Sequence, residues 1–379
     1  MPGLTVESSP CPSAGQLKVL WNDLEQRSGG SVFLSWAWIG TLVETSSRPL
    51  TLLSVREGVR LVGLAVLGES AGHGPFSRLT HHLNQSGDPA LDGVTIEYNG
   101  LLAERGLEAA VAEVFVSALC GTNSEPLSPP VRRLVLAGVE ESLGRLCAEH
   151  GLQTRLIKQP QGAPYADLTA LPADDLLKGF SANTRQQIRR SLRFYAQRGP
   201  LVLERASSVD EAWSWFHGLE AFHTEAWRRR AKNGAFGSPA FARFHRRILA
   251  DHFDHGPDVL RVRAGRGAIA YLYNFVWRGE VYAYQSGFAY EPHTDARPGL
   301  VAHALAMGHY REQGLSRYRF LAGDARYKQS LSTGRDELHW LEVSRPSLLS
   351  GVEHLLRLGY GRLFGGRLRE ADGHHSQKG

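Results

Sequence analysis

Apolar residues recur first at helical and then at strand spacing in the opening part of the chain. The runs 16–26 and 35–43 place apolar side chains three or four residues apart, which predicts two helices. The apolar-rich runs 50–55 and 59–67 are separated by Glu57-Gly58, which predicts a β-hairpin. The first part of the chain is therefore expected to mix helices and strands.

The same patterning continues through a break in composition. Residues 106–119 predict a helix, and the stretch 121–130 is rich in Gly, Asn, Ser and Pro, as loops are. A strand at 131–138, a helix at 141–150 and a strand at 152–157 are predicted next. We place a domain boundary between residues 157 and 158, which gives a first domain at 1–157, a second at 158–345, and a C-terminal helix with a disordered tail at 346–379.

The second half has clearer apolar periodicity and clearer signals for where helices and strands begin and end. It predicts, in order, helix 183–198 ended by Gly199, strand 201–205, helices 210–230 and 239–255, strands 258–264, 268–277 and 280–289, helix 298–313, strand 317–321, a short helix near 327–331 and strand 337–343. After its opening helix, the order is βααβββαβ, followed by a short helix and one last strand. A mixed α/β fold follows.

Composition narrows the class of protein. The 379 residues are 42% hydrophobic and 21% charged, which suits two globular domains, and no apolar run is long enough to span a membrane. Residues 1–16 have neither a basic start nor an apolar stretch, so we expect no secretory signal and a cytoplasmic location. The three cysteines and sixteen histidines show no metal-type spacing, so we predict free thiols and no metal. The net charge of +5 suits an anionic small ligand as well as a nucleic acid.

Three motifs follow one another in the second half. They are Ser181-Ala-Asn-Thr-Arg185, then Tyr284-Gln-Ser-Gly287 followed by Arg297-Pro-Gly299, then Phe320-Leu-Ala-Gly323-Asp324 followed by Tyr327-Lys328. With this order of elements, the run 165–343 resembles the GNAT-type domain of the CelD-like (cellulose-biosynthesis) acetyltransferase family. Phe33-Leu-Ser-Trp36-Ala-Trp38 and the hairpin after it resemble the same family more weakly. The resemblance implies tandem GNAT-like domains, the first of them degenerate.

The loop Arg297-Pro298-Gly299 lies between a strand and a helix, where free N–H groups and the positive helix end can hold a pyrophosphate. The resemblance makes this loop the binding site for acetyl-CoA or another acyl-CoA, with Ser286 and Lys328 as further contacts. Because the fuller glycine-rich loop of GNAT proteins is missing, an ordinary loop that enters a helix is the alternative. Lys328 either binds phosphate or pairs with Asp324.

Acyl transfer from a thioester to an amine needs a donor for the developing oxyanion and a base for the amine proton. The resemblance places Ser286 and Gly287 where the fourth strand of GNAT enzymes splays and offers a backbone N–H, and Gly287 would ease a bulge there. Asp324 is the predicted base or amine anchor, or else it caps the short helix after it. Tyr327 is the predicted acid for the leaving thiolate, or else a packing residue.

Candidate acceptor contacts come from two helices and a strand. Arg185, Arg189 and Arg193 form a stripe on one helix face, which indicates an anionic partner or a solvated surface. The remaining candidates lie on the helix 210–230 and on the strand 280–289, where they line either a pocket or the surface and core. We predict substrate contacts from Arg185, Glu225, Trp227 and Tyr284.

The resulting hypothesis is an N-acyltransferase that moves an acyl group, preferably acetyl, from acyl-CoA to the amine of a small-molecule or sugar-derived acceptor by direct attack. The resemblance implies polysaccharide or secondary-metabolite chemistry, and a hydroxyl acceptor remains open. A Fem-type aminoacyltransferase, which would use aminoacyl-tRNA and bind RNA phosphate with the arginine helix, is the first alternative. A non-catalytic GNAT-like ligand-binding protein is the second. The oligomeric state is open.

Overall fold

The elements of the first half alternate between short helices and strands. The computed structural model describes residues 3–71, 79–121, 127, 131–228 and 235–346. The elements of the first half are β1 (Leu4–Pro10), α1 (Ala14–Arg27), α2 (Trp36–Thr45), β2 (Leu50–Glu57), β3 (Arg60–Ser70), β4 (Thr80–Leu83), α3 (Pro89–Asp92), β5 (Leu102–Ala103), α4 (Glu108–Cys120), β6 (Arg133–Glu140), α5 (Glu141–Glu149) and β7 (Gln153–Asp167).

The second half contains the elements that its periodicity predicts, in the predicted order. They are α6 (Ala182–Ala196), β8 (Leu201–Arg205), α7 (Val209–Arg228), α8 (Pro239–His252), β9 (Pro257–Ala264), β10 (Gly267–Trp277), β11 (Glu280–Phe288), α9 (Pro298–Glu312), β12 (Arg317–Arg319), α10 (Arg326–Ser330) and β13 (Gly334–Ser344). Short 3₁₀ helices occur at Val32–Leu34, Leu176–Gly179 and Ala235–Gly237. The predicted C-terminal helix and tail lie, apart from Pro346, outside the described residues.

Local chemistry explains why these elements start and stop where they do. Ser181 caps α6, since its hydroxyl accepts the N–H of Thr184 at 3.2 Å. Beyond that helix Gly199 has φ +125°, a conformation that favours glycine. The turn between β10 and β11 has positive φ at both Arg278 (+49°) and Gly279 (+77°), as a type I′ hairpin turn requires.

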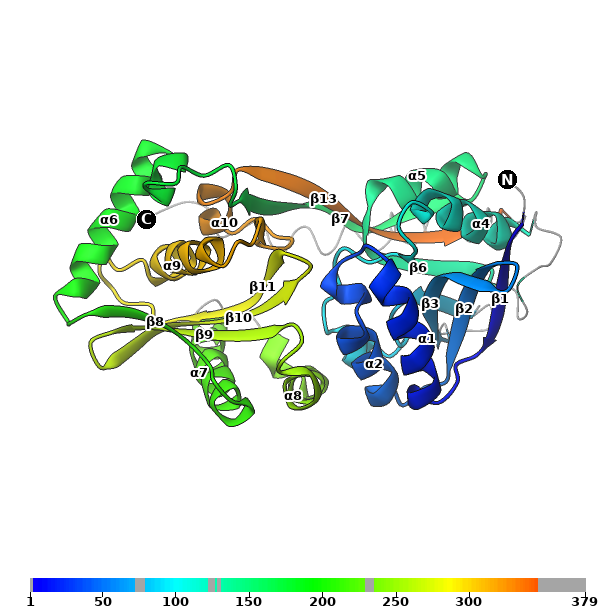
Figure 1. Ribbon diagram of the computed structural model, residues 1–379, viewed down its shortest axis with the longest axis horizontal. Helices are drawn as coiled ribbons and strands as arrows, with labels where there is room; N and C mark the ends of the chain where they lie inside the picture. Colours follow the sequence, from blue (N-terminus) through cyan, green and yellow to red (C-terminus); the bar gives the residue numbers. More distant parts are fainter. Residues whose placement is uncertain (1–2, 72–78, 122–126, 128–130, 229–234, 347–379) are drawn as a thin grey trace, which may run out of the picture.

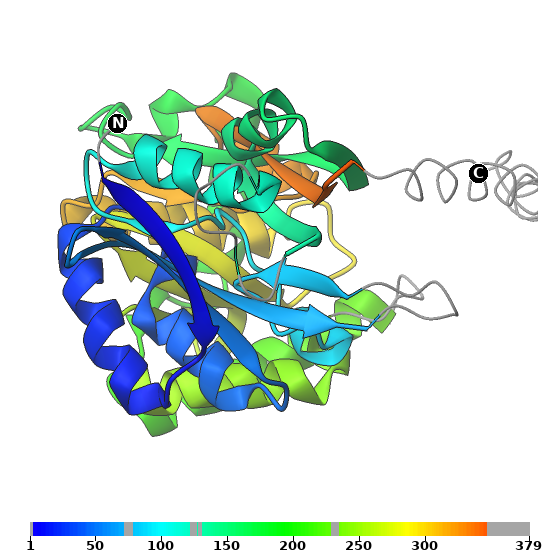
Figure 2. The same ribbon diagram turned by 90° about the vertical axis from the view of Figure 1, so that its right-hand side faces the viewer.

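The two halves repeat one plan. The order β1-α1-α2-β2-β3-β4-α4-β6-α5-β7 in the first half matches β8-α7-α8-β9-β10-β11-α9-β12-α10-β13 in the second. The first half adds α3 and β5 between β4 and α4. In both halves, helices cover the two faces of the strands (Figures 1 and 2). The predicted mixed α/β fold with two tandem units is confirmed.

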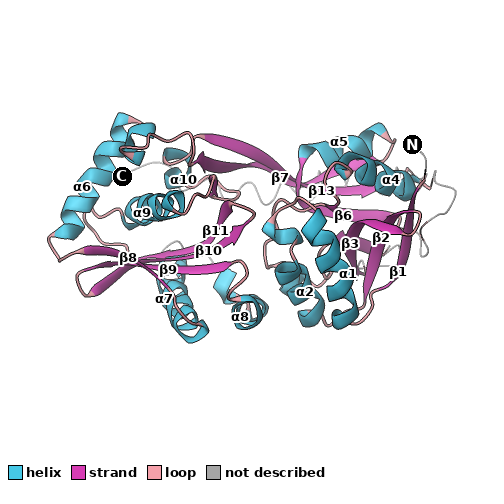
Figure 3. Cartoon of the chain, viewed as in Figure 1, coloured by secondary structure: helices cyan, strands magenta, loops and turns pink. Residues whose placement is uncertain are grey.

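The last strands of the two units are exchanged. In the described part of the chain, a 13-stranded sheet has the order β1-β2-β3-β4-β6-β13-β7-β12-β11-β10-β9-β8, and β5 pairs with β3. β13 therefore lies beside β6 of the first unit, and β7 lies beside β12 of the second. Both strands cross between the halves as a twisted ribbon (Figures 1 and 3). The predicted boundary at 157/158 falls inside β7, because the chain pairs with β13 and β12 on both sides of it.

An aromatic cluster joins the halves away from this ribbon. Trp38 of α2 packs against Phe244 of α8, Phe275 of β10 and Tyr284 of β11, with ring centroids 5.1, 5.8 and 5.4 Å apart. All four side chains are buried. Because edge-to-face aromatic pairs add to ordinary apolar burial, this contact fixes the first half against the wall of the second.

Candidate active site

A cavity opens where β11 and β12 separate. The two strands are parallel neighbours only from Glu280 to Tyr282. β12 ends at Arg319, and the N–H of Phe320 then donates to Pro164 O of β7 at 2.9 Å. The remainder of β11 diverges from β12, and a cavity of about 750 Å³ lies along it. That volume falls within the range usual for small-molecule sites.

The walls of the cavity come from both halves of the chain. The second half contributes β11, the start of α9, α10 with the loop before it, one residue of α6 and three residues of α7. An extended segment of the first half completes the lining. The residues that carry the chemistry are Thr95, Glu97, Gln187, His223, Trp227, Tyr284, Ser286, Arg297, Pro298, Gly299, Arg326, Tyr327 and Lys328.

One end of the cavity is suited to an anion. α9 begins at Pro298, and its first turn contains no acidic residue. A side chain at Gly299 would put its Cβ 3.3 Å from the Phe288 ring, so glycine permits this close packing. The exposed cations Arg297 and Arg326 also line the cavity. Free N–H groups at a helix start, the helix dipole and two guanidinium groups all favour a negatively charged ligand.

Tyr327 is held in the cavity wall between two neighbours. Its ring stacks on His303 with centroids 4.9 Å apart, and its hydroxyl is hydrogen-bonded to Ser286 of β11. Burial raises the pKa of Tyr327 to about 12, and the Ser286 contact opposes this only in part. Burial also lowers the pKa of His303 to about 3. The stack therefore pairs a protonated phenol with a neutral imidazole at neutral pH.

The loop after β12 contacts two side chains of opposite charge, the buried Glu97 and the partly buried Lys328. The N–H of Ala322 donates to Glu97 Oε2 at 2.6 Å, and Lys328 Nζ donates to Ala322 O at 2.8 Å and to Leu321 O at 3.3 Å. Burial raises the pKa of Glu97 and lowers that of Lys328. Leu321 has φ +62°, an uncommon conformation for a branched residue, and such strain concentrates at functional sites.

Aromatic and polar side chains form the opposite wall. Trp227 Nε1 donates to His223 Nε2 at 2.8 Å on α7, and Tyr284 donates its hydroxyl to Thr95 O at 3.3 Å. The second contact joins β11 to the first half. Together with Glu97, these groups give this end of the cavity an anionic and aromatic character.

Eight of the twelve site residues predicted from the sequence line this cavity: Trp227, Tyr284, Ser286, Arg297, Pro298, Gly299, Tyr327 and Lys328. Asp324, Gly287, Arg185 and Glu225 are not among its lining residues. Asp324 is exposed on the loop before α10, and its charge acts on Lys328. Glu225 pairs with Arg228 at 2.9 Å on α7.

Glycine is required at position 287 for a steric reason that the sequence did not reveal. The strand bulge expected at Gly287 lies instead at Tyr284, since the register of β10 against β11 passes from Gln285 to Ala283. A Cβ on Gly287 would lie 2.5 Å from Leu219 O of α7. Glycine is therefore needed there because the α7 backbone packs directly on the strand.

One arginine of the α6 stripe, Arg189, has an acidic partner, as does Arg190 beside the stripe. Arg189 pairs with Asp175 and the neighbouring Arg190 pairs with Asp295, each at 2.7 Å. Arg185 donates to Phe180 O at 3.2 Å. The α6 residue that lines the cavity is Gln187.

Glu97 is the functional candidate that sequence reasoning missed. Its segment alternates apolar Val94, Ile96 and Tyr98 with polar Thr95 and Glu97, which indicates an extended stretch with one buried face. That alternation could have identified the extended segment. The partner of Glu97, the N–H of Ala322, is 225 residues away in sequence and could not be inferred from local pattern.

Two other features bear on ligands and location. Among the described residues, no three His, Cys, Asp or Glu side chains are grouped so that they could hold a metal ion. Over the same ranges, no helix combines the length and apolar character needed to cross a membrane.

Comparison with known proteins assigns the second half to a family. Residues 182–329 match the acetyltransferase (GNAT) domain family. No curated protein sequence matches the chain. The structure is similar to that of FemX (11% identity, 88% of this chain and 96% of that chain, TM-score 0.56). It is also similar to the C-terminal domain of a protein assigned as a lysylphosphatidylglycerol synthetase from Agrobacterium fabrum (15% identity, 92% and 97%, TM-score 0.52).

At these identities the two structural likenesses concern the fold, and they extend over both halves. The family match concerns the unit that contains the cavity. This unit is a GNAT-type acetyltransferase domain, and the protein is an acyltransferase.

Proposed function

We propose that the protein transfers an acyl group, preferably acetyl, from acyl-CoA to the amine of a small-molecule or sugar-derived acceptor by direct attack. The observation that carries the proposal lies within the matched residues 182–329. There the start of α9, Ser286 of β11 and the pair Tyr327-Lys328 face one cavity of about 750 Å³. A donor site and groups able to act on a thioester are thus close together.

The donor would enter at the end of the cavity that the start of α9, Arg297 and Arg326 form. The pyrophosphate of coenzyme A would accept hydrogen bonds from the backbone N–H groups of Gly299 and Leu300, with Arg297 and Arg326 supplying positive charge. The pantetheine arm would run along the diverging edge of β11 toward Ser286. This direction brings the thioester to Tyr327, at the middle of the cavity.

The chemistry needs a polarised carbonyl and a protonated leaving group. A backbone N–H of β11 next to Ser286 would bind the thioester oxygen, which is the role that the sequence assigns to Ser286 and Gly287. Tyr327, whose pKa is raised to about 12, stays protonated at neutral pH and would give its proton to the departing thiolate. Asp324 remains the base that the sequence proposes, although it acts from outside the cavity lining.

The acceptor would occupy the aromatic end. Trp227 offers a flat face of the kind that packs against sugar rings, and Tyr284 lines this end from the aromatic cluster. The proposed roles of Arg185 and Glu225 need a larger acceptor that reaches beyond the cavity lining. The CelD-like resemblance supports an acceptor from polysaccharide or secondary-metabolite chemistry.

A direct test combines binding and turnover. Calorimetry with acetyl-CoA should give saturable binding, and a pool of primary amines and amino sugars should stimulate release of free thiol from acetyl-CoA. Mass analysis of the products then identifies the acylated amine. Absence of acetyl-CoA binding together with absence of thiol release would refute the proposal.

A second candidate is an aminoacyl-tRNA-dependent transferase of the Fem type. It is supported by the likeness in fold to FemX over 88% of this chain. The pairing of Arg189 and Arg190 with acidic neighbours weighs against an RNA-binding face on α6. Binding of tRNA that weakens steeply with salt, without affinity for acetyl-CoA, would favour this candidate over ours.

A further inference from the structure

An inserted segment bridges the diverging strands of the first half. In the first unit, β4 and β6 are parallel neighbours only at His81-His82, as β11 and β12 are at their start. The gap beyond is bridged by Asn99, whose Nδ2 donates to Leu83 O at 2.9 Å and to Ala137 O at 3.1 Å. Asn84 Nδ2 in turn donates to Asn99 Oδ1 at 2.9 Å. The segment 84–103, which includes α3 and β5, thus bridges β4 and β6, and its residues 98–101 line a separate cavity of about 510 Å³ beside the start of α4.

The same segment contributes Glu97 to the cavity of the second half. Glu97 lines that cavity and is only 6% exposed. Its Oε2 accepts the Ala322 N–H, and no other donor among the described residues bonds to the carboxylate, so Oε1 is available to a ligand. Lys328 and Lys158 favour the ionised carboxylate, and the oxygen that accepts no protein donor can accept a hydrogen bond from a ligand.

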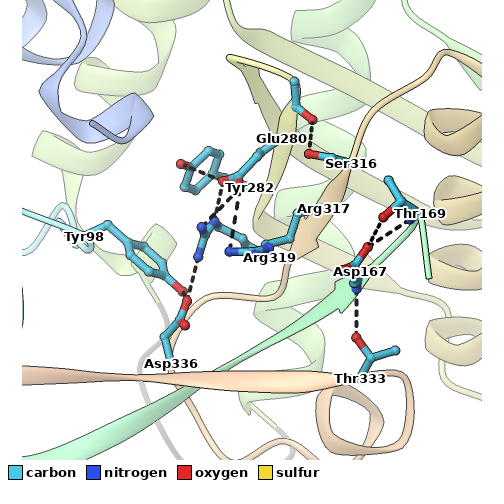
Figure 4. Close-up of polar contacts among 11 residues, drawn as sticks. Tyr98, Asp167, Thr169, Glu280, Tyr282, Ser316, Arg317, Arg319, Thr333 and Asp336 are labelled. Carbon is cyan, nitrogen blue, oxygen red and sulfur yellow. Dashed lines mark hydrogen bonds and ion pairs between the residues drawn. The ribbon is translucent and has the colours of Figure 1, made fainter. Parts of the chain in front are cut away.

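The position of Glu97 is fixed by a network on its neighbour Tyr98. The Tyr98 hydroxyl donates to Asp336 Oδ2 of β13 at 2.9 Å, and Arg319 Nη1 donates to the same oxygen at 2.6 Å. Arg319 Nε also donates to Glu280 Oε2 of β11 at 2.6 Å (Figure 4). The guanidinium lies 4.6 Å from the centre of the Tyr98 ring. β11, β12 and β13 therefore hold the segment rigidly, as a positioned base requires.

We propose that Glu97, supplied by the first half, binds the acceptor as an ammonium ion and takes the proton that leaves its nitrogen. This inference rests on the proposed function and deepens it. It assigns the acceptor to the amines that are cationic at neutral pH, in preference to alcohols. It also transfers the role of base from the exposed Asp324 to a group inside the cavity.

The proton balance of the step is as follows. The ammonium first loses one proton to solvent, so that a neutral amine attacks the thioester carbonyl carbon. The C–N bond forms, the C–S bond breaks, and Glu97 Oε1 receives the second proton from nitrogen. Tyr327 gives its phenolic proton to the thiolate, and the proton held by Glu97 returns to Tyr327 through the solvent-filled cavity. The products are the amide, free coenzyme A thiol and one proton in solution.

Several groups set the charge of Glu97. Lys328 and Lys158 favour its ionised form, burial opposes ionisation, and Asp324 acts on it only through Lys328. Tyr284 faces it from β11 and is neutral at ordinary pH, because burial raises the Tyr284 pKa. Since Glu97 must be ionised to accept a proton, the rate should rise with pH through a pKa above the usual carboxyl range.

The experiment measures thiol release from acetyl-CoA across pH 5 to 9, with the best amine and its hydroxyl analogue as acceptors. Glu97→Gln keeps the shape and a carbonyl-type acceptor for the Ala322 N–H, and Glu97→Asp keeps the charge. Glu25→Gln is the matched control, because Glu25 also accepts a backbone N–H, from Trp36, and its pKa is also raised by burial, but it lies outside the cavity. Asp324→Asn tests the competing assignment. Calorimetry follows acetyl-CoA binding in every variant.

We expect Glu97→Gln to lower kcat for the amine about 100-fold, to remove the acidic limb of the pH profile and to leave the acetyl-CoA Kd within about twofold of native. Glu97→Asp should recover part of kcat, and Glu25→Gln should match the native enzyme. A Glu97→Gln enzyme with native kcat and pH profile, or a larger loss in Asp324→Asn than in Glu97→Gln, would overturn this inference alone. If the native protein neither binds acetyl-CoA nor releases thiol, the proposed function fails and this inference fails with it.

Discussion

The two units have the same order of elements, but an inserted segment bridges the diverging strands of the first and nothing corresponding bridges those of the second in the described residues. In the first unit, Asn84 and Asn99 bridge the strands β4 and β6 through backbone carbonyls. In the second, β11 and β12 diverge around a cavity, and nine residues, 289–297, connect β11 to α9. The comparison teaches that the first unit keeps the fold while an insertion bridges β4 and β6 and lines a smaller cavity of about 510 Å³.

The corresponding helices α4 and α9 also differ in the charge at their starts. α4 has an acidic residue in its first turn, Glu108, whose Oε2 accepts the N–H of Gly106 at 2.8 Å. α9 has no acidic residue there and follows Arg297 directly. Because an acidic residue satisfies and neutralises a helix start, α4 is closed to a phosphate while α9 attracts one.

The largest expected effect comes from the chemistry of the open cleft. Tyr327→Phe should lower kcat about 100-fold, because the leaving thiolate loses its proton donor, with little change in acetyl-CoA affinity. Steady-state thiol release measures it. Tyr195→Phe is the control, since the buried Tyr195 hydroxyl on α6 has no hydrogen-bond partner among the described residues. Equal rates for Tyr327→Phe and the native enzyme would remove Tyr327 from the mechanism.

Removing the Asn99 bridge between β4 and β6 should lower the stability of the protein. Asn99→Ala removes the bridge between β4 and β6 and leaves buried carbonyl groups without donors, which should lower the free energy of unfolding by about 2 kcal/mol. Urea unfolding followed by circular dichroism measures the change. Asn183→Ala, at an exposed position on α6, should stay within about 0.5 kcal/mol of native. A neutral Asn99→Ala would mean that the insertion is not what holds the first unit together.

A smaller effect, on the affinity for acetyl-CoA, should distinguish the start of α9 from the start of α4. Arg297→Ala should raise the Kd for acetyl-CoA about 10-fold, as expected when one charge-assisted contact to phosphate is lost. The counterpart Glu108→Gln in α4 should leave that Kd unchanged. Calorimetry at two salt concentrations measures both, and equal effects at the two helices would argue against a donor site confined to α9.

Much of this fold could be predicted from the sequence because apolar periodicity, helix caps and turn residues are local signals. The helices α6, α7 and α9 and the hairpin β10–β11 follow from apolar spacing, from Ser181 as a cap and from Arg278-Gly279 as a turn. β1 and β4 were missed because Leu4–Pro10 and Thr80–Leu83 are short and largely polar, so their strand conformation depends on pairing with β2 and β3.

The exchange of the last strands and the composition of the site were not accessible in this way. The run 152–157 reads as a complete strand, yet β7 continues to Asp167 because β13 and β12 pair with it, and those partners are more than 150 residues away. Of the cavity lining, the motifs identified the loop 297–299 and Tyr327-Lys328, which belong to one unit. Glu97 depends on contacts between units, and nothing local marks such a contact.

The central claim is that the chain has one donor site, in the second unit, because Arg297 and Arg326 line its cavity whereas Glu108 and Glu140 line the smaller cavity of the first. Calorimetric titration of the native protein with acetyl-CoA tests this most directly through its stoichiometry. We predict one equivalent bound per chain. Two equivalents per chain would show that the first cleft is also open to the donor, and no binding would contradict the assignment of the cavity to acyl-CoA.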